Sequence, residues 1–178
     1  MNKTLLGCVV ALLSLSTAAY AGPFDMLNSK AGKQVQKGAS ATMNATVAKK
    51  VNAKLLSESR ANQCSFKVDS DQLEPGCDAK AKRLANALVS AKKALNSSGV
   101  HTYKFVVTGH TDTSGNAAHN MDLSKRRAQT IVKQLIAKGV NANEIEAVGM
   151  GASHPLVKPD NTPAKKAKNR RYELQVRF

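Results

Sequence analysis

An acid and a guanidinium stand close together in one polar stretch of the sequence. Residues 109–115 read GHTDTSG and place Asp112 just after an expected strand, while Arg127 falls in the first turn of an expected helix. The carboxyl ends of strands in α/β folds commonly form ligand sites, and small polar loop residues offer backbone N–H groups that can face a carboxylate. The pair matches a zwitterion, with an ammonium on Asp112 and a carboxylate in a bidentate fork with Arg127. The competing interpretation is that the two charges only pair with each other as a structural salt bridge.

A histidine in the same stretch suggests hydrolysis, but the pattern does not support it. His110 stands near Asp112 and Ser114, yet a catalytic triad needs a nucleophile–base–orienter geometry that one tight loop does not normally supply. The chain also has no nucleophile-elbow motif. His110, His119 and His154 lack the spacing of a known metal site. We therefore expect no enzyme, no catalytic residue, no metal and no cofactor.

The 178-residue chain has the composition of a folded, strongly basic protein. Hydrophobic residues make up 42% of it, which argues against wholesale disorder, and the length fits one domain with a short appendage. Lys and Arg number 27 against 12 Asp and Glu, for a formal net charge of +15, so an anionic partner is expected. Aromatic residues are only 4% and Trp is absent, which disfavours a nucleic-acid binder that stacks bases.

The segment 1–21 has the pattern of a signal peptide. Lys3 precedes an apolar run over 5–15, and residues 19–21 (AYA) form a small-x-small cleavage box. We expect cleavage after Ala21 and export, which removes most nucleic acid from consideration. Two alternatives stay open. One is an uncleaved anchor, because the apolar run is nearly long enough to span a bilayer; the other is lipidation at Cys8, in the sequence LLGC.

Two cysteines, Cys64 and Cys77, remain once the signal peptide is removed. An even pair in an exported chain suggests one disulfide. Their short separation would close a small loop, with a stabilisation of about 3 kcal/mol in the chain-entropy model. A metal pair is the competing interpretation, but two cysteines without close histidine partners make a poor zinc site.

The segment 22–62 reads as a polar lead followed by an amphipathic helix. Val47, Val51 and Leu55 recur every four residues, so a helix over 41–58 is expected. This helix is either a solvated spacer that leans on the main domain or a docking or dimerising helix. The apolar stripe is too short to favour the second interpretation.

The segment 63–178 alternates between strand and helix patterns. Apolar residues recur with the helical period in two segments, each followed by a glycine, and β-branched or alternating apolar runs mark four strands. The order β-α-β-α-β-β predicts an α/β (α+β) fold, a two-layer sandwich with a mixed four-stranded sheet and helices on one face. The expected elements are a strand over 65–68, a helix over 78–96, a strand over 103–108, a helix with Ser124 as its N-cap that ends before Gly139, a strand over 145–148, a helical turn over 165–170 and a final strand over 172–178.

Three separate blocks of this domain closely resemble the OmpA-like peptidoglycan-binding domain family. The first block covers 109–128 with the pattern GHTD-x2-G-x4-N-x2-LS-x2-RA. The sequences GxG at 149–151 and NRR at 169–171 follow in the expected order and spacing. The resemblance covers about residues 64–178 and implies the same two-layer sandwich, to which the two cysteines are additions.

The resemblance also implies roles for the polar residues of these blocks. In the family, the positions of Asp112 and Arg127 clamp the diaminopimelate of the peptidoglycan stem peptide, and Asn120 positions the ligand or the loop. Asn120 taken alone would equally fit an Asx-turn or a cap. Asn169 with Arg170 or Arg171 would close the rim, one of the two arginines being structural. The whole expected binding set is Gly109, Thr111, Asp112, Asn120, Arg127, Asn169, Arg170 and Arg171.

The function implied by the resemblance is non-enzymatic anchoring of an exported envelope protein to the cell wall of a Gram-negative bacterium. Peptidoglycan is the expected partner, the periplasm the expected compartment, and the segment 22–62 is open to an outer-membrane or other envelope partner. The alternative is a protein–protein interaction module with wall binding secondary. A flagellar stator-type subunit would need a retained membrane helix with a proton-handling acid, and residues 4–21 contain no acid.

Overall fold

The computed structural model describes residues 30–178, with side chains from residue 45 onward. The chain divides into two compact units, Met1–Ala39 and Ser40–Phe178, and the sheet and groove described below belong to the second. The expected signal peptide, its cleavage after Ala21 and the lipidation of Cys8 lie outside the described residues. In the part of the chain that is described, none of the helices combines the length and apolar character needed to cross a membrane.

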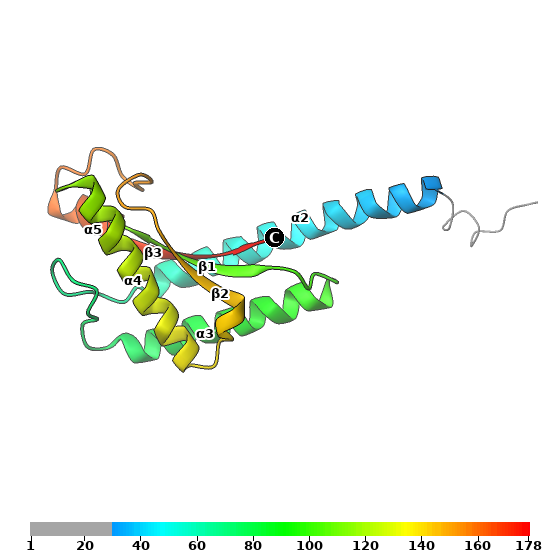
Figure 1. Ribbon diagram of the computed structural model, residues 1–178, viewed down its shortest axis with the longest axis horizontal. Coiled ribbons are helices and arrows are strands. Elements are labelled where there is room, and N and C mark those ends of the chain that lie inside the picture. Colours follow the sequence, from blue (N-terminus) through cyan, green and yellow to red (C-terminus); the bar gives the residue numbers. More distant parts are fainter. Residues whose placement is uncertain (1–29) are drawn as a thin grey trace, which may run out of the picture. The chain divides into compact units, whose positions relative to one another are not determined.

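Helices and strands follow one another in nearly the expected order (Figure 1). The helix expected over 41–58 is longer than predicted, whereas the helix expected over 78–96 and three of the four strands lie within two residues of their predicted bounds. The elements are α2 Lys30–Ala61, α3 Cys77–Ser97, β1 Lys104–His110, α4 Ala117–Ala137, the 3-10 helix η1 Ala142–Glu144, β2 Ile145–Gly149, α5 Pro163–Asn169 and β3 Arg171–Arg177.

The sheet has three strands in the order β2-β1-β3, with β1 parallel to β2 and antiparallel to β3. The mixed sheet is confirmed, but the predicted fourth strand does not join it. The segment expected as a strand over 65–68 makes a single bridge, between Phe66 and Leu73. The N–H of Lys67 donates to the Gln72 carbonyl over 2.9 Å, so this segment pairs with its own return rather than with β3.

Two side-chain amides cover the outer edge of β3 in place of a fourth strand. Asn52 on α2 donates from Nδ2 to the Val176 carbonyl over 3.2 Å and accepts from the Val176 N–H over 2.6 Å. Gln63, just after α2, makes the same pair of bonds with Tyr172, at 2.7 and 3.2 Å. Each amide therefore satisfies one N–H and one carbonyl of the edge, groups that a neighbouring strand would otherwise bond.

The hydrophobic core lies on one face of the sheet. Phe105 and Val107 of β1 point to this face, together with their β3 partners Val176 and Leu174. The opposite face carries half-buried polar side chains such as Glu173. Because the helices pack into the same cluster, they cover one face, as predicted. The helical members of the cluster are Val51 and Leu55 of α2, Cys77, Ala81, Leu84, Ala85, Leu88, Ala91 and Leu95 of α3, and Ala128, Ile131 and Leu135 of α4.

Helix α4 begins about two turns before the predicted start. Its N-cap is Asn116, whose Oδ1 accepts from two N–H groups of the first turn over 2.8 and 3.2 Å. The predicted cap, Ser124, is fully buried inside the helix, where its hydroxyl accepts from the Gly151 N–H over 2.9 Å. Arg127 therefore lies about three turns into α4, not in its first turn.

Candidate ligand-binding groove

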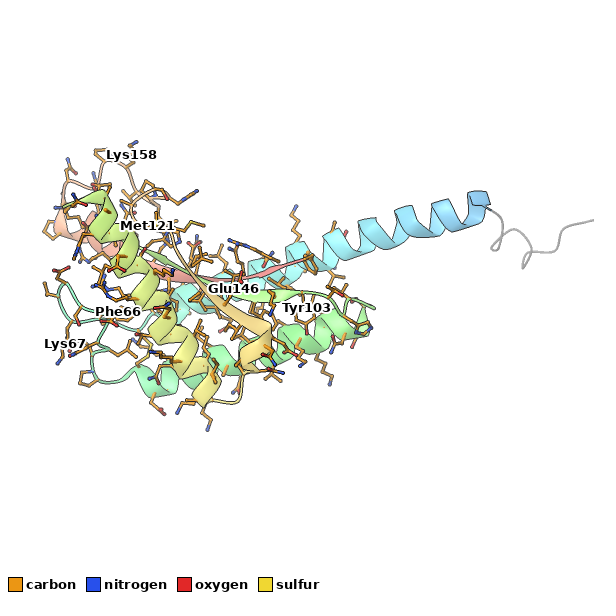
Figure 2. The ribbon with its side chains drawn as sticks, viewed as in Figure 1. Phe66, Lys67, Tyr103, Met121, Glu146 and Lys158 are labelled. Carbon is orange, nitrogen blue, oxygen red and sulfur yellow. A yellow bond between two sulfur atoms is a disulfide. The ribbon has the colours of Figure 1, made fainter. Side chains whose placement is uncertain are left out.

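A groove of about 1010 Å³ opens at the carboxyl end of β1. It is lined by the loop from β1 into α4, by the segment 63–69 that precedes α3, and by residues of the region 156–172 around α5. Figure 2 shows the side chains of the domain, with Phe66 and Lys67 labelled on the second of these segments. Six of the eight expected binding residues line the groove: Thr111, Asp112, Asn120, Arg127, Arg170 and Arg171.

The carboxylate of Asp112 is held from two sides. Its Oδ1 accepts from the Ser114 N–H over 2.9 Å, and its Oδ2 accepts from the Arg170 guanidinium over 2.8 Å. Burial would raise the pKa of this carboxyl, but the hydrogen bonds from Arg170 and Ser114 outweigh it, so the pKa of Asp112 lies below its ordinary value of 3.8. Asp112 is therefore an anion at neutral pH, with 14% of its side chain exposed.

The guanidinium of Arg127 is held by the segment before α3. Its Nε donates to the Ser70 carbonyl over 2.8 Å, and its Cζ lies 5.1 Å from the centroid of the Phe66 ring. Burial and the charge of Arg170 lower the pKa of Arg127, but an arginine stays cationic at neutral pH. Asp112 pairs with Arg170 and Arg127 bonds to backbone, so the two charges of the sequence motif are not each other's partners.

Asn120 braces the loop that carries Asp112. It lies buried in the first turn of α4, where its Nδ2 donates to the Ser114 carbonyl over 2.8 Å and to the Asp112 carbonyl over 3.5 Å. The side chain also lines the groove. Its contacts therefore hold the loop in place, which is one of the two roles expected for it.

Two buried polar atoms beside these charges have no hydrogen-bond partner among the described residues. They are Nδ1 of His110 and Oγ1 of Thr111, and both residues line the groove. The backbone of Thr111 is fixed, because its N–H donates to the Gly151 carbonyl over 2.9 Å. Burial, followed by the charge of Arg171, lowers the pKa of His110 to about 4, so its imidazole is neutral at neutral pH.

The histidines considered for a metal site have separate surroundings. His119 contacts Asp69, with Nε2 and Oδ1 2.6 Å apart, whereas the rings of His110 and His154 lie 6.5 Å apart, centroid to centroid. Among the described residues, no group of three His, Cys, Asp or Glu side chains is placed to hold a metal ion.

The two consecutive arginines before and within β3 have different surroundings. Arg170 is half exposed and reaches Asp112. The side chain of Arg171 is only 7% exposed; its Nε donates to Glu173 over 2.8 Å and its Nη2 donates to the His154 carbonyl over 3.0 Å. Both arginines line the groove, but Arg170 is the exposed one that reaches Asp112, whereas the side chain of Arg171 is buried and ties β3 to the loop after β2.

Two residues of the expected binding set lie away from the groove and support the fold. Gly109 packs against α4 so closely that a Cβ there would overlap the Ser124 carbonyl. Asn169 is fully buried, and its Oδ1 accepts from the N–H groups of Leu156 and Val157 over 2.8 and 3.0 Å. Asn169 therefore holds the backbone of the loop after β2 by hydrogen bonds and does not close the rim of the groove.

Asp160 braces the loop that carries Asp112, a role that the sequence does not predict. One oxygen accepts from the Thr113 N–H and from Asn169 Nδ2, both over 2.9 Å, and the other accepts from the Thr113 hydroxyl. These bonds, that of the Thr113 hydroxyl first, lower the pKa of Asp160 to about 2. The residue joins the loop after β2 to the loop that carries Asp112. The stretch KPDN at 158–161 signals a turn, but nothing in it signals this partner.

The groove thus presents the carboxylate of Asp112 and the guanidinium groups of Arg127 and Arg170, each held by backbone or by another side chain. Further charged residues of the lining, most of them basic, surround these three: Arg60, Lys67, Asp69, Lys168 and Arg171. Such pre-arranged charges suit recognition of a small ligand that carries both signs. The fold and the groove together define a small α/β binding domain. The chain belongs to the OmpA family, whose match covers residues 65–170, more than half of its length.

Individual relatives show how far this similarity extends. Outer membrane protein A of Klebsiella pneumoniae is 42% identical over 80 residues, covering 40% of this chain and 23% of the relative. Outer membrane protein A of Bordetella avium is 29% identical over 111 residues, covering 62% of this chain and 52% of the relative. The chain therefore spans about half of the length of the Bordetella avium protein and less than a quarter of the length of the Klebsiella pneumoniae protein.

Solved structures share the fold. The peptidoglycan-associated lipoprotein of Burkholderia pseudomallei matches with a TM-score of 0.53 at 25% identity, over 65% of this chain and 89% of that one. The periplasmic domain of Helicobacter pylori MotB matches with a TM-score of 0.52 at 23% identity, over 62% of this chain and 68% of that one. The cell wall anchor of the T6SS from Pseudomonas aeruginosa matches with a TM-score of 0.50 at 25% identity, over 64% and 73%. These likenesses confirm the predicted fold class, an OmpA-like α/β sandwich.

Proposed function

We propose that this protein binds peptidoglycan without catalysis, through the diaminopimelate of the stem peptide, and so anchors an exported envelope protein to the wall of a Gram-negative cell. Asp112 takes the ammonium of the ligand and Arg127 takes its carboxylate. The observation that carries the proposal is that these two charges line one groove and are not paired with each other. The ligand is thereby offered both signs without first having to break an ion pair between them.

The hydrogen-bonding capacity of both groups supports this assignment. A carboxylate has about four acceptor sites, and Asp112 uses two of them, for the Ser114 N–H and for Arg170. A guanidinium has five N–H donors, and Arg127 uses two of them on backbone carbonyls. Each group keeps free sites for a ligand, and Arg170 adds a second cation beside Asp112.

The family and the structural relatives support the same function. Two of the matched structures are a peptidoglycan-associated lipoprotein and a cell wall anchor. Both are matched over most of their length by this chain, and both share its domain. Binding to peptidoglycan is therefore the function we carry over to this chain, with the periplasm as its compartment.

Sedimentation with purified sacculi tests the proposal. We expect the chain from Gly22 onward to sediment with sacculi, and Asp112→Ala and Arg127→Ala to stay in the supernatant while circular dichroism shows them folded. Arg126→Ala is the matched control. It removes the same charge from the residue just before Arg127, and Arg126 pairs with Asp122 of its own helix. Equal sedimentation of all four proteins, lost at high salt, would mean that only the basic surface binds.

The ligand itself is tested by changing the stem peptide. Sacculi with lysine in place of diaminopimelate keep the side-chain ammonium and lack the second carboxylate. Loss of a charged hydrogen bond to Arg127 predicts binding weaker by at least about tenfold. Equal binding to both wall types would refute the assignment of Arg127. Failure to bind either wall type would instead favour the alternative of a protein-binding module.

A further inference from the structure

The segment that holds Arg127 is a loop closed by a disulfide. Cys64 and Cys77 form the predicted bond, with their Cα atoms 5.1 Å apart, and we call residues 64–77 the disulfide loop. From this loop, Ser70 and Lys67 offer the carbonyls that accept from Arg127, at 2.8 and 3.4 Å. The ring of Phe66, also on the loop, supplies the face on which the guanidinium lies.

The disulfide loop holds these groups in place by its own hydrogen bonds. The N–H of Glu74 donates to the Ser65 carbonyl over 2.9 Å, which closes the loop like a short hairpin. The N–H of Ser70 donates to the Lys67 carbonyl over 3.2 Å at the turn. Asp69, inside that turn, has φ of 51°, in the left-handed region. The two carbonyls that receive Arg127 are therefore presented by a tight turn.

Contacts at both ends fix the disulfide loop on the domain. At its base, the Cys64 N–H donates to the hydroxyl of Tyr172 over 3.0 Å, and both cysteines are buried in the core. At its tip, Asp69 contacts His119 of α4, and this partner lowers the pKa of Asp69. The loop thus spans from the core to α4, along the wall of the groove that contains Arg127.

We propose that the disulfide loop is a positioning element for Arg127, and that the Cys64–Cys77 bond makes the affinity for the ligand depend on the redox state. The proposal rests on the proposed function of the groove. An arginine that is already immobilised loses less side-chain freedom on binding than one that is free. Opening the loop returns that freedom to Arg127, and we expect affinity for sacculi to fall about tenfold.

The first test follows Arg127 directly. The Nε–H resonance of Arg127, assigned by comparison with Arg127→Lys, reports the bond to the Ser70 carbonyl. On reduction with a phosphine we expect this resonance to move to the position of a free arginine, while the Nε–H of Arg170 keeps its position. Affinity for sacculi should fall in step, with the fold retained by circular dichroism. An unchanged Arg127 resonance and unchanged affinity after reduction would overturn the proposal.

A second test leaves the disulfide intact. Phe66→Leu removes the ring under the guanidinium but keeps an apolar side chain, and Phe66→Tyr keeps the ring. We expect the leucine variant to bind sacculi severalfold more weakly while circular dichroism shows it folded, and the tyrosine variant to bind like the parent protein. Equal binding by both variants would contradict a positioning role. If the parent protein does not bind sacculi, the proposed function fails, but the Arg127 resonance still decides whether the loop positions this side chain.

Discussion

The amide of Asn52 offers a sharp test of how the sheet edge is stabilised. Its two bonds, at 3.2 and 2.6 Å, occupy the carbonyl and the N–H of Val176 on the outer edge of β3. Asn52→Ala removes both bonds and leaves two backbone groups without their partner. The same change improves helix propensity, because alanine is the best helix former and asparagine is worse by about 0.5 kcal/mol. Helix propensity and edge bonding therefore predict changes of opposite sign in the free energy of unfolding of Asn52→Ala.

The expected magnitude follows from the two bonds. Each hydrogen bond contributes about 1 kcal/mol net, so the pair contributes about 2 kcal/mol. Subtracting the gain in propensity leaves a loss of about 1.5 kcal/mol in the free energy of unfolding. With an m-value of about 2 kcal/mol/M in urea, the midpoint of unfolding should fall by roughly 0.7 M.

Urea unfolding followed by circular dichroism measures this difference. Asn86→Ala is the matched control, since Asn86 is exposed on α3 and the same substitution there should leave the midpoint unchanged or raise it slightly. Asn52→Asp adds a second comparison, because it keeps an acceptor for the Val176 N–H but sets an oxygen against the Val176 carbonyl. A midpoint for Asn52→Ala equal to or above that of the parent protein would refute the view that side-chain amides stabilise this edge.

Three further outcomes are expected. Reducing the Cys64–Cys77 disulfide should lower the free energy of unfolding by about 3 kcal/mol, seen as separate urea curves for oxidised and reduced protein; coincident curves would contradict this. Gly109→Ala should cost about 1–3 kcal/mol by forcing β1 away from the Ser124 carbonyl, so a melting temperature equal to the parent's would show that the contact yields freely. The pKa of Asp160 is lowered to about 2 from an ordinary 3.8, so its contribution to stability is complete above pH 3.8 and is lost as the pH falls through 2. Asp160→Asn should therefore weaken the dependence of stability on pH in acid. If the free energy of unfolding fell equally in both proteins between pH 5 and 2, that role would be contradicted.

Much of the fold is local, and the sequence predicts it well. The helical period of α3 and the apolar run of β1 are properties of contiguous residues, so their bounds agree with the structure within two residues. The predicted start of α4 is wrong because the first two turns of the helix border the groove and carry no continuous apolar stripe. The residue nearest before the apolar stripe that fits an N-cap is therefore Ser124. The predicted first strand failed for a non-local reason, since the edge of β3 is bonded by side chains of α2 and Gln63.

The groove was predicted in its residue types but not in its contacts. Asp112, Asn120 and Arg127 were placed by a motif, and all three line the groove. The partners of the charges are distant in the chain: Arg127 bonds to Ser70, and Asp112 bonds to Arg170. Such pairs depend on how loops from separate elements pack together, and one sequence has no periodicity that reports it.

The position of the disulfide also has a mechanical consequence. Helix α2 ends at Ala61, three residues before Cys64, and Cys77 is the first residue of α3. Tension along the chain that reaches Cys64, beyond the contacts that α2 makes with the core, would therefore pass through the sulfur atoms into α3. The twelve residues from 65 to 76, which hold Arg127, lie in parallel with this covalent link and carry little of the load. The disulfide would therefore shield the carbonyls that hold Arg127 from tension transmitted along the chain.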